Sequence, residues 1–272
     1  MCLAAAGSTK CLDKLKRLEN VLGKMGSVVV AFSGGVDSSF LLKMTRDLLP
    51  KEDVLAVTAV SDTYTKRELA QAKKFAKSLG IRHKIIYTNE MRDKRFIKNP
   101  KDRCYYCKKE LFIKLKRMAK GIVIDASNID DKSDYRPGTK AKEELGVRSP
   151  LQEAGITKQE IRRFSKRQGL KTWDLPPMPC LASRIPYGKR ISKVTLQRIE
   201  KAENFIRDLG VDLVRVRYHN DTARLEVEKK DVKKFFNQRF CDKIVRHLKG
   251  LGFKYVALDL EGYRTGSLNE VL

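Results

Sequence analysis

The chain has 272 residues, enough for one large domain or two modest ones that each bury a core, and we expect two. Its 58 Lys and Arg against 33 Asp and Glu give a net charge of +25, which favours anionic partners such as nucleotides, other phosphorylated small molecules or RNA. No stretch approaches the ~20 apolar residues of a membrane span, and the first residues lack the basic start of a secretory signal. We therefore expect a cytoplasmic protein without membrane association. Its six cysteines are then expected to be reduced thiols, metal ligands or catalytic groups rather than disulfides.

The first predicted helix covers residues 12–22, where leucines recur at helical spacing and would bury one face. Cys2 lies before this helix and Cys11 lies at its start. We expect both cysteines to be structural or incidental.

A loop suited to phosphate follows the first predicted strand. Residues 28–30 are consecutive valines, which is typical of a strand buried on both faces, and the two glycines after it permit unusual backbone conformations. The helix expected from about residue 38 to 49 would direct the positive end of its dipole at this loop. Neither G-x-x-x-x-G-K-[ST] nor G-x-G-x-x-G is present, and residues 33–39, SGGVDSS, resemble instead the PP-loop of ATP pyrophosphatases. The residues expected to hold the pyrophosphate of ATP are Ser33, Gly34, Gly35, Asp37, Ser38 and Ser39.

Strands and helices alternate after the loop. We predict strands over residues 54–60, 83–88 and 121–127, and helices over residues 64–79 and 109–119. Such alternation is typical of βαβ units, so the first domain is expected to be α/β with a parallel sheet and with ligands at the carboxyl ends of its strands.

A cysteine pair ends a polar, basic segment of the first domain. Residues 91–107 contain Asn99-Pro100 and are expected to form an irregular loop. Cys104 and Cys107 form a C-x-x-C motif at its end. Such a motif can be a redox pair, half of a metal site or two unrelated thiols.

Acidic side chains follow the strand predicted over residues 121–127. Asp130 and Asp131 come soon after its end, and residues 134–138, DYRPG, follow. Carboxylates at this edge are well placed to hold Mg²⁺ for a triphosphate. Helix capping and turn formation favour the same residue types, and both interpretations stay open for Asp130.

A proline-rich connection predicts the domain border. A basic helix opens with a capping box at residues 157–160, and three prolines then fall within residues 176–179. We therefore predict a first domain over residues 1–174 and a second over residues 175–272. Cys180 comes directly after the prolines, beside Ser183 and Arg184, in a segment that would hold its thiol near an anion-binding group.

The second domain is predicted to be a smaller α+β module. Arg215 and Arg217 share one face of its first strand, and Glu226 lies on its second strand. The module has helices over residues 194–209 and 232–248, strands over residues 213–218, 222–228 and 255–260, and a hairpin at Asn220-Asp221.

The whole chain resembles the LarE family of ATP-dependent sulfur transferases. The resemblance rests on SGGVDSS, RCYYCK, SNIDDKSDYRPG and PCLASRIPYG, which occur in this order and cover both domains. It implies that the enzyme adenylates a carboxylate of pyridinium-3,5-biscarboxylic acid mononucleotide, releases pyrophosphate and inserts sulfur to give a thiocarboxylate. That product feeds the nickel-pincer cofactor of lactate racemase and related enzymes.

The resemblance also implies roles for particular residues. Mg²⁺ would be held by Asp131, which we favour as functional on this ground, and by Glu226, which would also order the site of the second domain. The side chains implied to clamp the phosphate of the nucleotide substrate are Ser183, Arg184, Arg215 and Arg217. The expected partners are this small molecule and a sulfide or other sulfur donor, and we expect a homo-oligomer.

The sulfur source depends on three cysteines. Some members of the family have only the cysteine that matches Cys180 and sacrifice its sulfur, whereas this chain has Cys104, Cys107 and Cys180 together. Three thiolates can hold three irons of a [4Fe-4S] cluster and leave the fourth open for a sulfide. We therefore predict the cluster-dependent variant, with these three cysteines as catalytic residues and metal ligands.

Three alternatives remain open at this point. The same thiols with His83, His219 or His247 would form a zinc site. A PP-loop enzyme that thiolates or binds tRNA would use the basic surface, but no added RNA-binding domain is recognisable, so we do not expect a nucleic-acid partner. A synthetase that forms amides from ammonia would leave the three cysteines without a purpose.

Overall fold

The computed structural model describes residues 9–132 and 135–271, so Cys2 and Asp134 lie outside the described residues. The chain forms two compact units. The first combines the described parts of Met1–Ser61, Lys66–Thr88 and Cys104–Leu175, and the second those of Asp62–Thr65, Asn89–Arg103 and Pro176–Leu272. The predicted border assigned residues 62–65 and 89–103 to the first domain, whereas the structure groups both segments with the second unit.

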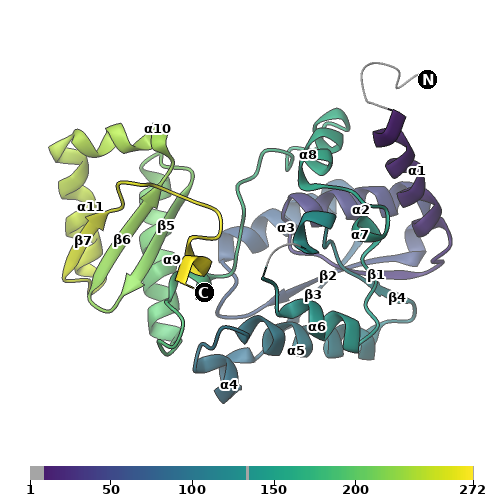
Figure 1. The fold of residues 1–272 in the computed structure, drawn as a ribbon, viewed down its shortest axis with the longest axis horizontal. Helices are drawn as coiled ribbons and strands as arrows, with labels where there is room; N and C mark the ends of the chain where they lie inside the picture. The colour runs from purple at the N-terminus through teal and green to yellow at the C-terminus, as the bar shows by residue number, and fades with distance from the viewer. Residues whose placement is uncertain (1–8, 133–134, 272) are drawn as a thin grey trace. The chain divides into compact units, whose positions relative to one another are not determined.

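The first unit contains a parallel sheet of four strands in the order β3-β2-β1-β4 among the described residues (Figure 1). The strands are β1 (Val28–Ala31), β2 (Val54–Val60), β3 (Arg82–Tyr87) and β4 (Ile122–Ile124). Every neighbouring pair is parallel. The predicted α/β fold class is therefore confirmed.

The valines of β1 place this strand at the centre of the sheet. Val28 and Val30 belong to one apolar core and Val29 belongs to the other, because successive side chains of a strand point to opposite faces. β1 pairs with β2 on one side and β4 on the other. The chain runs outward through β2 and β3 and then returns to β4, so the switch point of the topology lies between β1 and β4. Ligands of open parallel sheets bind beyond the carboxyl ends of strands at such a point.

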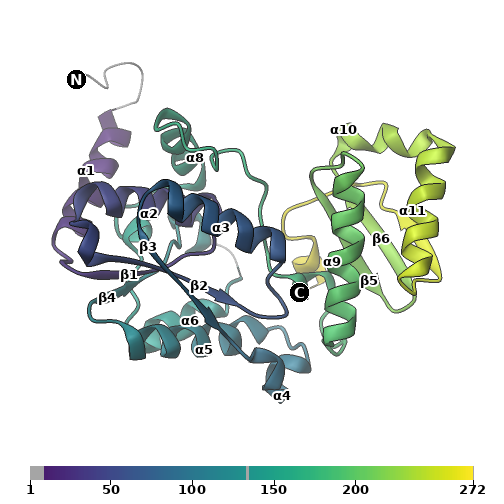
Figure 2. The same cartoon turned by 180° about the vertical axis from the view of Figure 1, so that it is seen from behind.

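Helices cover both faces of this sheet (Figures 1 and 2). One face carries α1 (Thr9–Gly23), α2 (Val36–Leu48), α3 (Lys66–Ser78), α7 (Pro150–Glu153) and α8 (Lys158–Arg167). The opposite face carries α5 (Arg103–Met118) and α6 (Gly138–Glu144). On the first face Phe40 of α2 stacks on Phe164 of α8, with ring centroids 5.9 Å apart. This contact links α2, the helix that follows the phosphate loop, to a helix far along the sequence.

Two sequence predictions need correction in the first unit. Residues 91–107 were expected to be irregular, but α4 (Lys94–Ile97) forms there and α5 already begins at Arg103. Pro100 lies before α5, where it breaks no helical hydrogen bond, and the amide of Arg103 donates to its carbonyl at 3.1 Å. Of the strand expected over residues 121–127, only Ile122–Ile124 forms β4, and beyond it the backbone amide of Asp125 donates to the carbonyl of Arg148 at 2.9 Å.

The second unit contains a mixed sheet in the order β5-β6-β7. Its elements are α4, α9 (Lys193–Asp208), β5 (Val214–His219), β6 (Thr222–Val227), α10 (Lys229–Val232), α11 (Gln238–Gly250) and β7 (Tyr255–Leu258). β5 and β6 form the predicted antiparallel hairpin, with Asn220 at a φ of 56° in its turn, and β7 joins β6 in parallel. The helix expected over residues 232–248 begins only at Gln238, because Asn237 caps it by accepting from the amide of Phe240 at 3.1 Å.

None of the helices in the described part of the chain combines the length and the apolar composition that a membrane crossing requires.

Candidate active site

The predicted phosphate loop follows β1 and opens α2. Gly35 is the N-cap of α2 and has no side chain that could cap the helix. The first backbone amides of α2 therefore receive no capping hydrogen bond from the N-cap residue. The hydroxyl groups of Ser33 and Ser38 lie 3.1 Å apart, and the Ser38 hydroxyl also lies 3.2 Å from the carbonyl of Gly35. Ser39 is fully buried. The loop thus presents backbone amides and hydroxyls at the positive end of a helix dipole, which is the chemistry that binds phosphate.

Gly34 is required at its position for two reasons. Its φ is +77°, in the left-handed region that favours glycine. A Cβ on Gly34 would also lie 3.0 Å from the Cβ of Ala72 and 3.1 Å from its Cα, in α3. The side-chain amide of Gln71 donates to the carbonyl of Gly34 at 3.0 Å. The loop is therefore held against α3 by close backbone approach.

Asp37 lies in the first turn of α2 and pairs with a lysine from far along the chain. The Nζ of Lys158 is 2.5 Å from Oδ2 of Asp37. The other oxygen of Asp37, Oδ1, is buried and has no hydrogen-bond partner among the described residues. A carboxylate oxygen without a donor is the kind of ligand that Mg²⁺ takes.

The turn after β4 brings further carboxylates to the same edge of the sheet. Asp130 accepts from the backbone amide of Lys158 at 2.8 Å, which supports the capping interpretation for this residue. Asp131 accepts from the amide of Asn128 at 2.9 Å and pairs with Arg136 at 2.8 Å.

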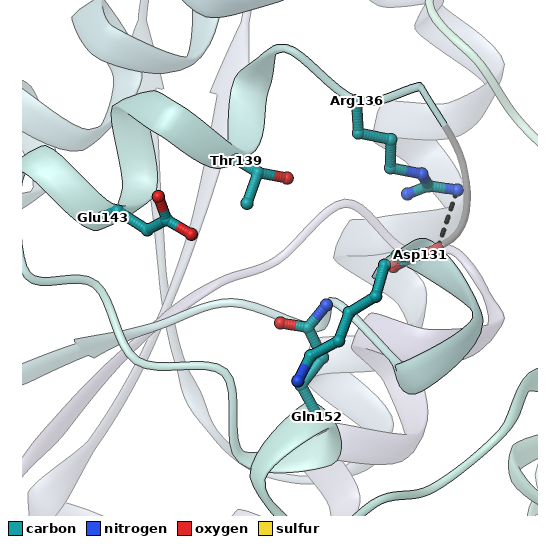
Figure 3. A pocket seen from close by; sticks show the side chains of 6 residues that line it. Asp131, Arg136, Thr139, Glu143 and Gln152 are labelled. Atoms are coloured by element: carbon teal, nitrogen blue, oxygen red, sulfur yellow. Dashed lines mark ion pairs between the residues drawn. The ribbon is translucent and has the colours of Figure 1, made fainter.

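Asp131 lines a pocket of about 340 Å³ (Figure 3). The lining residues are Asp131, Lys132, Arg136, Thr139, Glu143 and Gln152. Figure 3 shows Arg136 reaching Asp131 from one side while Thr139 and Glu143 project from α6 on the other. The residues that line the pocket carry both signs of charge.

The pKa of Asp131 is raised. Burial is the main cause, and Asp37 adds repulsion, while Arg136 and the Asn128 amide act in the opposite direction. Folding therefore favours the protonated form of Asp131, and ionisation costs stability at pH values above the raised pKa. A cation bound beside this carboxylate would offset that cost.

The cysteines of the C-x-x-C motif lie at the start of α5, and neither forms a disulfide within the described residues. Cys104 is exposed and Cys107 is half-buried. Their spacing of three residues places both on one helix face. Cys180 is also half-buried and forms no disulfide within the described residues, but it belongs to the second unit, at the N-cap of the 3₁₀ helix Leu181–Arg184.

Within the described residues, no three His, Cys, Asp or Glu side chains form a group that could hold a metal ion. The histidines of the zinc alternative have other contacts. The ring of His83 lies 2.8 Å from the hydroxyl of Thr58, and the ring of His247 stacks on Phe205 at 3.7 Å. The thiols have the donor chemistry of a cluster site, and their use in one is a proposal taken up below.

The arginines predicted to clamp a substrate phosphate already hold the backbone around Cys180. They donate to four carbonyls of this segment: Arg184 to Pro179 and Cys180, Arg215 to Pro177, and Arg217 to Ser183. The Nε atoms of Arg215 and Arg217 are buried without a hydrogen-bond partner in the described part of the chain. Their role toward a phosphate stays a prediction.

Glu203 of α9 is a buried partner that sequence reasoning missed. It is fully buried and accepts from Nε of Arg184 at 2.8 Å, from Arg207 at 2.6 Å and from the amide of Val216 at 3.1 Å. Burial alone would raise its pKa, but Arg184, with help from Arg215 and Arg207, holds the pKa at about 2. Burial and the neighbouring Arg184 lower the pKa of Arg215 to about 10.

Glu226 is also fully buried, and its carboxylate pairs with Arg217 at 2.7 Å and Arg224 at 3.0 Å. Ser267 donates to it at 3.3 Å. These contacts favour the ordering role predicted for Glu226 and leave its predicted Mg²⁺ role without support, because arginines occupy both oxygens.

Two other residues of the site had only partial sequence signals. The capping box predicted the start of α8, and the structure forms it between Thr157 and Glu160, but nothing indicated that Lys158 would reach the phosphate loop. Asn99 lay in the segment expected to be irregular, yet it is fully buried in the second unit. Neither the position of Lys158 nor the burial of Asn99 could be predicted from periodicity, because both depend on residues that are distant in the sequence.

The chain is similar to known proteins over the segment that contains the phosphate loop. The NAD synthase family model matches residues 12–111, which include the phosphate loop. Argininosuccinate synthase of Campylobacter jejuni is 40% identical over 72 residues, which is 26% of this chain and 17% of that protein.

Two relatives align along nearly the whole chain. An uncharacterised protein of Synechocystis is 42% identical over 264 residues, 96% of this chain and 98% of its own length. Pyridinium-3,5-bisthiocarboxylic acid mononucleotide synthase of Lactiplantibacillus plantarum is 37% identical over 263 residues, 95% of each chain. The similarity therefore extends over both units.

Proposed function

The chain belongs to the LarE family of PP-loop proteins, and we propose on this premise that it is an adenylating sulfurtransferase that converts a pyridinium carboxylate into a thiocarboxylate. The substrate would be pyridinium-3,5-biscarboxylic acid mononucleotide and the product a precursor of the nickel-pincer cofactor. In the first step the carboxylate attacks the α-phosphate of ATP, and pyrophosphate leaves. In the second step a sulfur nucleophile attacks the acyl adenylate, and AMP leaves.

The observation that carries the proposal is the loop of residues 33–39. It lies beyond the carboxyl end of β1, beside the switch point of the sheet, and at the N-terminus of α2. Its amides and hydroxyls would bind the pyrophosphate as charge develops on the leaving oxygens. A carboxylate has no good leaving group, so this activation is what makes the sulfur step feasible.

Asp37 and Asp131 would hold Mg²⁺ at this loop. The buried, unpaired Oδ1 of Asp37 and the raised pKa of Asp131 both fit a bound cation. Magnesium would neutralise the phosphates and orient them for in-line attack.

Cys104, Cys107 and Cys180 would hold a [4Fe-4S] cluster, and a cluster bound there would supply sulfide for the activated carboxylate. Three features of the chain support this role. None of the three forms a disulfide within the described residues, Cys104 and Cys107 lie three residues apart at the start of α5, and Arg184 donates to the carbonyl of Cys180.

The buried arginines of the second unit would contribute to substrate binding. Arg215 and Arg217 each keep one Nε without a hydrogen-bond partner in the described structure, and Ser183 and Arg184 adjoin them through the loop. A nucleotide phosphate is the anion that such groups bind in pairs. We also propose a cytoplasmic homo-oligomer without a nucleic-acid partner.

The proposal is tested on protein purified without oxygen. We expect bound iron and acid-labile sulfide, and AMP and thiocarboxylate from ATP, Mg²⁺, sulfide and the pyridinium mononucleotide. Cys104→Ala should lose the iron and the thiocarboxylate while pyrophosphate release on the first turnover continues, because adenylation uses the loop and not the thiols. Iron analysis, pyrophosphate detection and mass spectrometry measure these three outcomes.

Cys241→Ala is the matched control, since this half-buried thiol of α11 contacts only the carbonyl of Phe235 among the described hydrogen bonds. It should keep the iron and both activities. Wild-type protein without iron, or a Cys104→Ala variant with unchanged iron and turnover, would contradict the cluster. A fully active Cys180→Ala variant would favour the amide-forming alternative.

A further inference from the structure

We propose that His83 is a positioning residue of the active site, which acts through the hydroxyl group of Thr58 to fix the peptide bond at the start of the phosphate loop. His83 touches no substrate in this role. The inference deepens the proposed function and rests on it, because the loop that His83 supports is the one proposed to bind pyrophosphate.

The carbonyl of Phe32 is the last main-chain acceptor before the phosphate loop of residues 33–39. The amide of Phe32 still joins the sheet, since it donates to the carbonyl of Val57 in β2 at 2.9 Å. On the other side of β1, the pairing with β4 has already ended at Val30, opposite Ile124. A buried carbonyl at such a point needs a hydrogen-bond donor, and a side chain supplies it here.

This donor is Thr58 of β2. Its hydroxyl donates to the carbonyl of Phe32 at 2.7 Å, and the residue is only 1% exposed. The carbonyl of Phe32 and the amide of Ser33 belong to one planar peptide unit, so a contact that orients the first also orients the second. The amide of Ser33 in turn donates to the hydroxyl of Ser38 at 3.3 Å, inside the loop. Thr58 therefore orients the peptide bond at which the loop begins.

His83 of β3 holds the hydroxyl of Thr58 in this orientation. Nε2 of His83 lies 2.8 Å from the hydroxyl oxygen of Thr58. A hydroxyl has one proton, and Thr58 gives it to Phe32, so the ring nitrogen must be the donor in this contact. The contact thus requires an imidazole that carries its proton on Nε2. Among the described residues the ring makes no other hydrogen bond.

The surroundings of His83 keep its ring in place and neutral. The rings of His83 and Phe32 meet edge to face, with centroids 5.8 Å apart and planes at 75°. Burial lowers the pKa of His83 below its ordinary value of 6.5, and repulsion from Lys73 of α3 lowers it further. A neutral ring acts on the geometry of the loop and adds no positive charge to it.

The loop needs support from outside because two of its residues are glycines. Gly34 has a φ of +77° and no side chain that would restrict its backbone. Amides that bind a phosphate are effective only when they already point at it before the ligand arrives. The chain of hydrogen bonds from His83 through Thr58 to Phe32 supplies this order at the start of the loop.

The test compares His83→Leu with His83→Gln in the full chain. Leucine has no donor, whereas the side-chain amide of glutamine can replace the N–H of Nε2. Calorimetry with inorganic pyrophosphate and Mg²⁺ should show about 3- to 10-fold weaker binding for His83→Leu, the range for one neutral hydrogen bond, and His83→Gln should recover most of it. The adenylation rate at saturating ATP should fall in parallel, while the KM for the pyridinium mononucleotide stays unchanged.

Thr58→Val should weaken binding at least as much as His83→Leu, and the double variant should be no weaker than Thr58→Val alone, because both changes break the same chain of hydrogen bonds. Thr45→Val is the matched control. Thr45 is fully buried in α2, and its hydroxyl donates to the carbonyl of Leu41 at 2.7 Å. This variant should lose a similar amount of thermal stability and bind pyrophosphate like the wild type. Additive losses in the double variant, or equal weakening by Thr45→Val, overturn the inference.

A second measurement uses the unaltered protein. The chain has three histidines, and nitrogen-15 NMR of their rings, assigned by comparison with His83→Gln, reports which ring nitrogen carries the proton. We expect the proton of His83 on Nε2, and a shift of its signals when magnesium pyrophosphate binds. A proton on Nδ1 alone, or signals that ignore the bound ligand, overturn the inference. Wild-type protein that binds neither pyrophosphate nor ATP overturns the proposed function as well, whereas tight binding that does not depend on His83 overturns the inference alone.

Discussion

Single buried charges fix the environment of Cys180. The Nη1 atom of Arg184 donates to the carbonyl of Cys180, and its Nε atom donates to the carboxylate of Glu203. Glu203 thereby determines where Arg184 lies, and Arg184 determines the path of the Cys180 segment. A carboxylate on α9 is thus a positioning residue for a thiol 23 positions away in the sequence.

At this scale we predict that Glu203→Gln destabilises the second unit by about 3 to 5 kcal/mol, because buried arginines lose their counter-charge. Hydrogen exchange of β5 and β6 would measure the loss. The pKa of Glu203 is lowered to about 2, so its contribution is fully present above its ordinary value of 4.5 and is lost as pH falls through 2. The difference between variant and wild type should therefore shrink below pH 4.5.

Glu200→Gln is the control for this prediction, since Glu200 lies on the same helix but is only half-buried. It should cost less than about 1 kcal/mol. Equal effects of the two variants would contradict the stabilising role given to Glu203.

At the scale of elements, the buried side chain of Asn99 joins two segments of the second unit that are distant in the sequence. Asn99 is buried and left-handed, with a φ of 57°, and its side-chain amide lies within 3.2 Å of the carbonyls of Ile185, Pro186 and Lys189. Its own carbonyl accepts from Gly188 at 2.9 Å. The segment Asn89–Arg103 is thereby tied to the loop that follows Cys180.

We predict that Asn99→Ala costs about 2 to 4 kcal/mol, because buried carbonyls lose their donor and alanine is strained at this φ. Asn99→Gly should fall between alanine and wild type, since glycine removes the strain alone. Urea denaturation followed by hydrogen exchange of residues 185–191 measures both.

Asn220→Ala provides the matched comparison. Asn220 has nearly the same φ, 56°, but it is exposed in the turn between β5 and β6. Its replacement should cost only the strain, about 1 to 2 kcal/mol. A larger loss at Asn220 than at Asn99 would contradict the role given to the buried amide.

The whole molecule carries a net charge of +25, which attracts any polyanion at low ionic strength. Many of these charges are spread over helices that already pair with acidic neighbours, as Lys14 does with Glu160 and Lys109 with Glu144. Dispersed charge of this kind gives attraction without a defined binding surface.

We therefore predict that tRNA binds at low salt and that the affinity falls by about 1,000-fold or more between 50 and 200 mM salt. A gel shift across this range measures the slope. Heparin of equal charge should compete as well as tRNA does. Binding that persists at physiological salt and resists heparin would favour the tRNA-thiolating alternative over the proposed substrate.

Local sequence determined much of this protein. The valines of β1, the glycines of the phosphate loop and the capping box at Thr157 depend on neighbouring residues, so periodicity and turn chemistry were sufficient to predict them. The order of strands and helices likewise predicted a parallel sheet with its ligand edge at the loop. Helix starts were less predictable, as at Arg103, where basic and aromatic residues concealed the first turn of α5.

Tertiary structure alone decided which distant side chains meet. Lys158 reaches Asp37 across 121 positions, Asn99 reaches the loop after Cys180 across 86 or more, and Glu203 binds Arg184 from another element. No local pattern encodes these pairs, because each depends on how helices pack on a sheet rather than on the spacing within one element. The sequence therefore determined the chemistry available at the loop, and packing decided which charges would serve it.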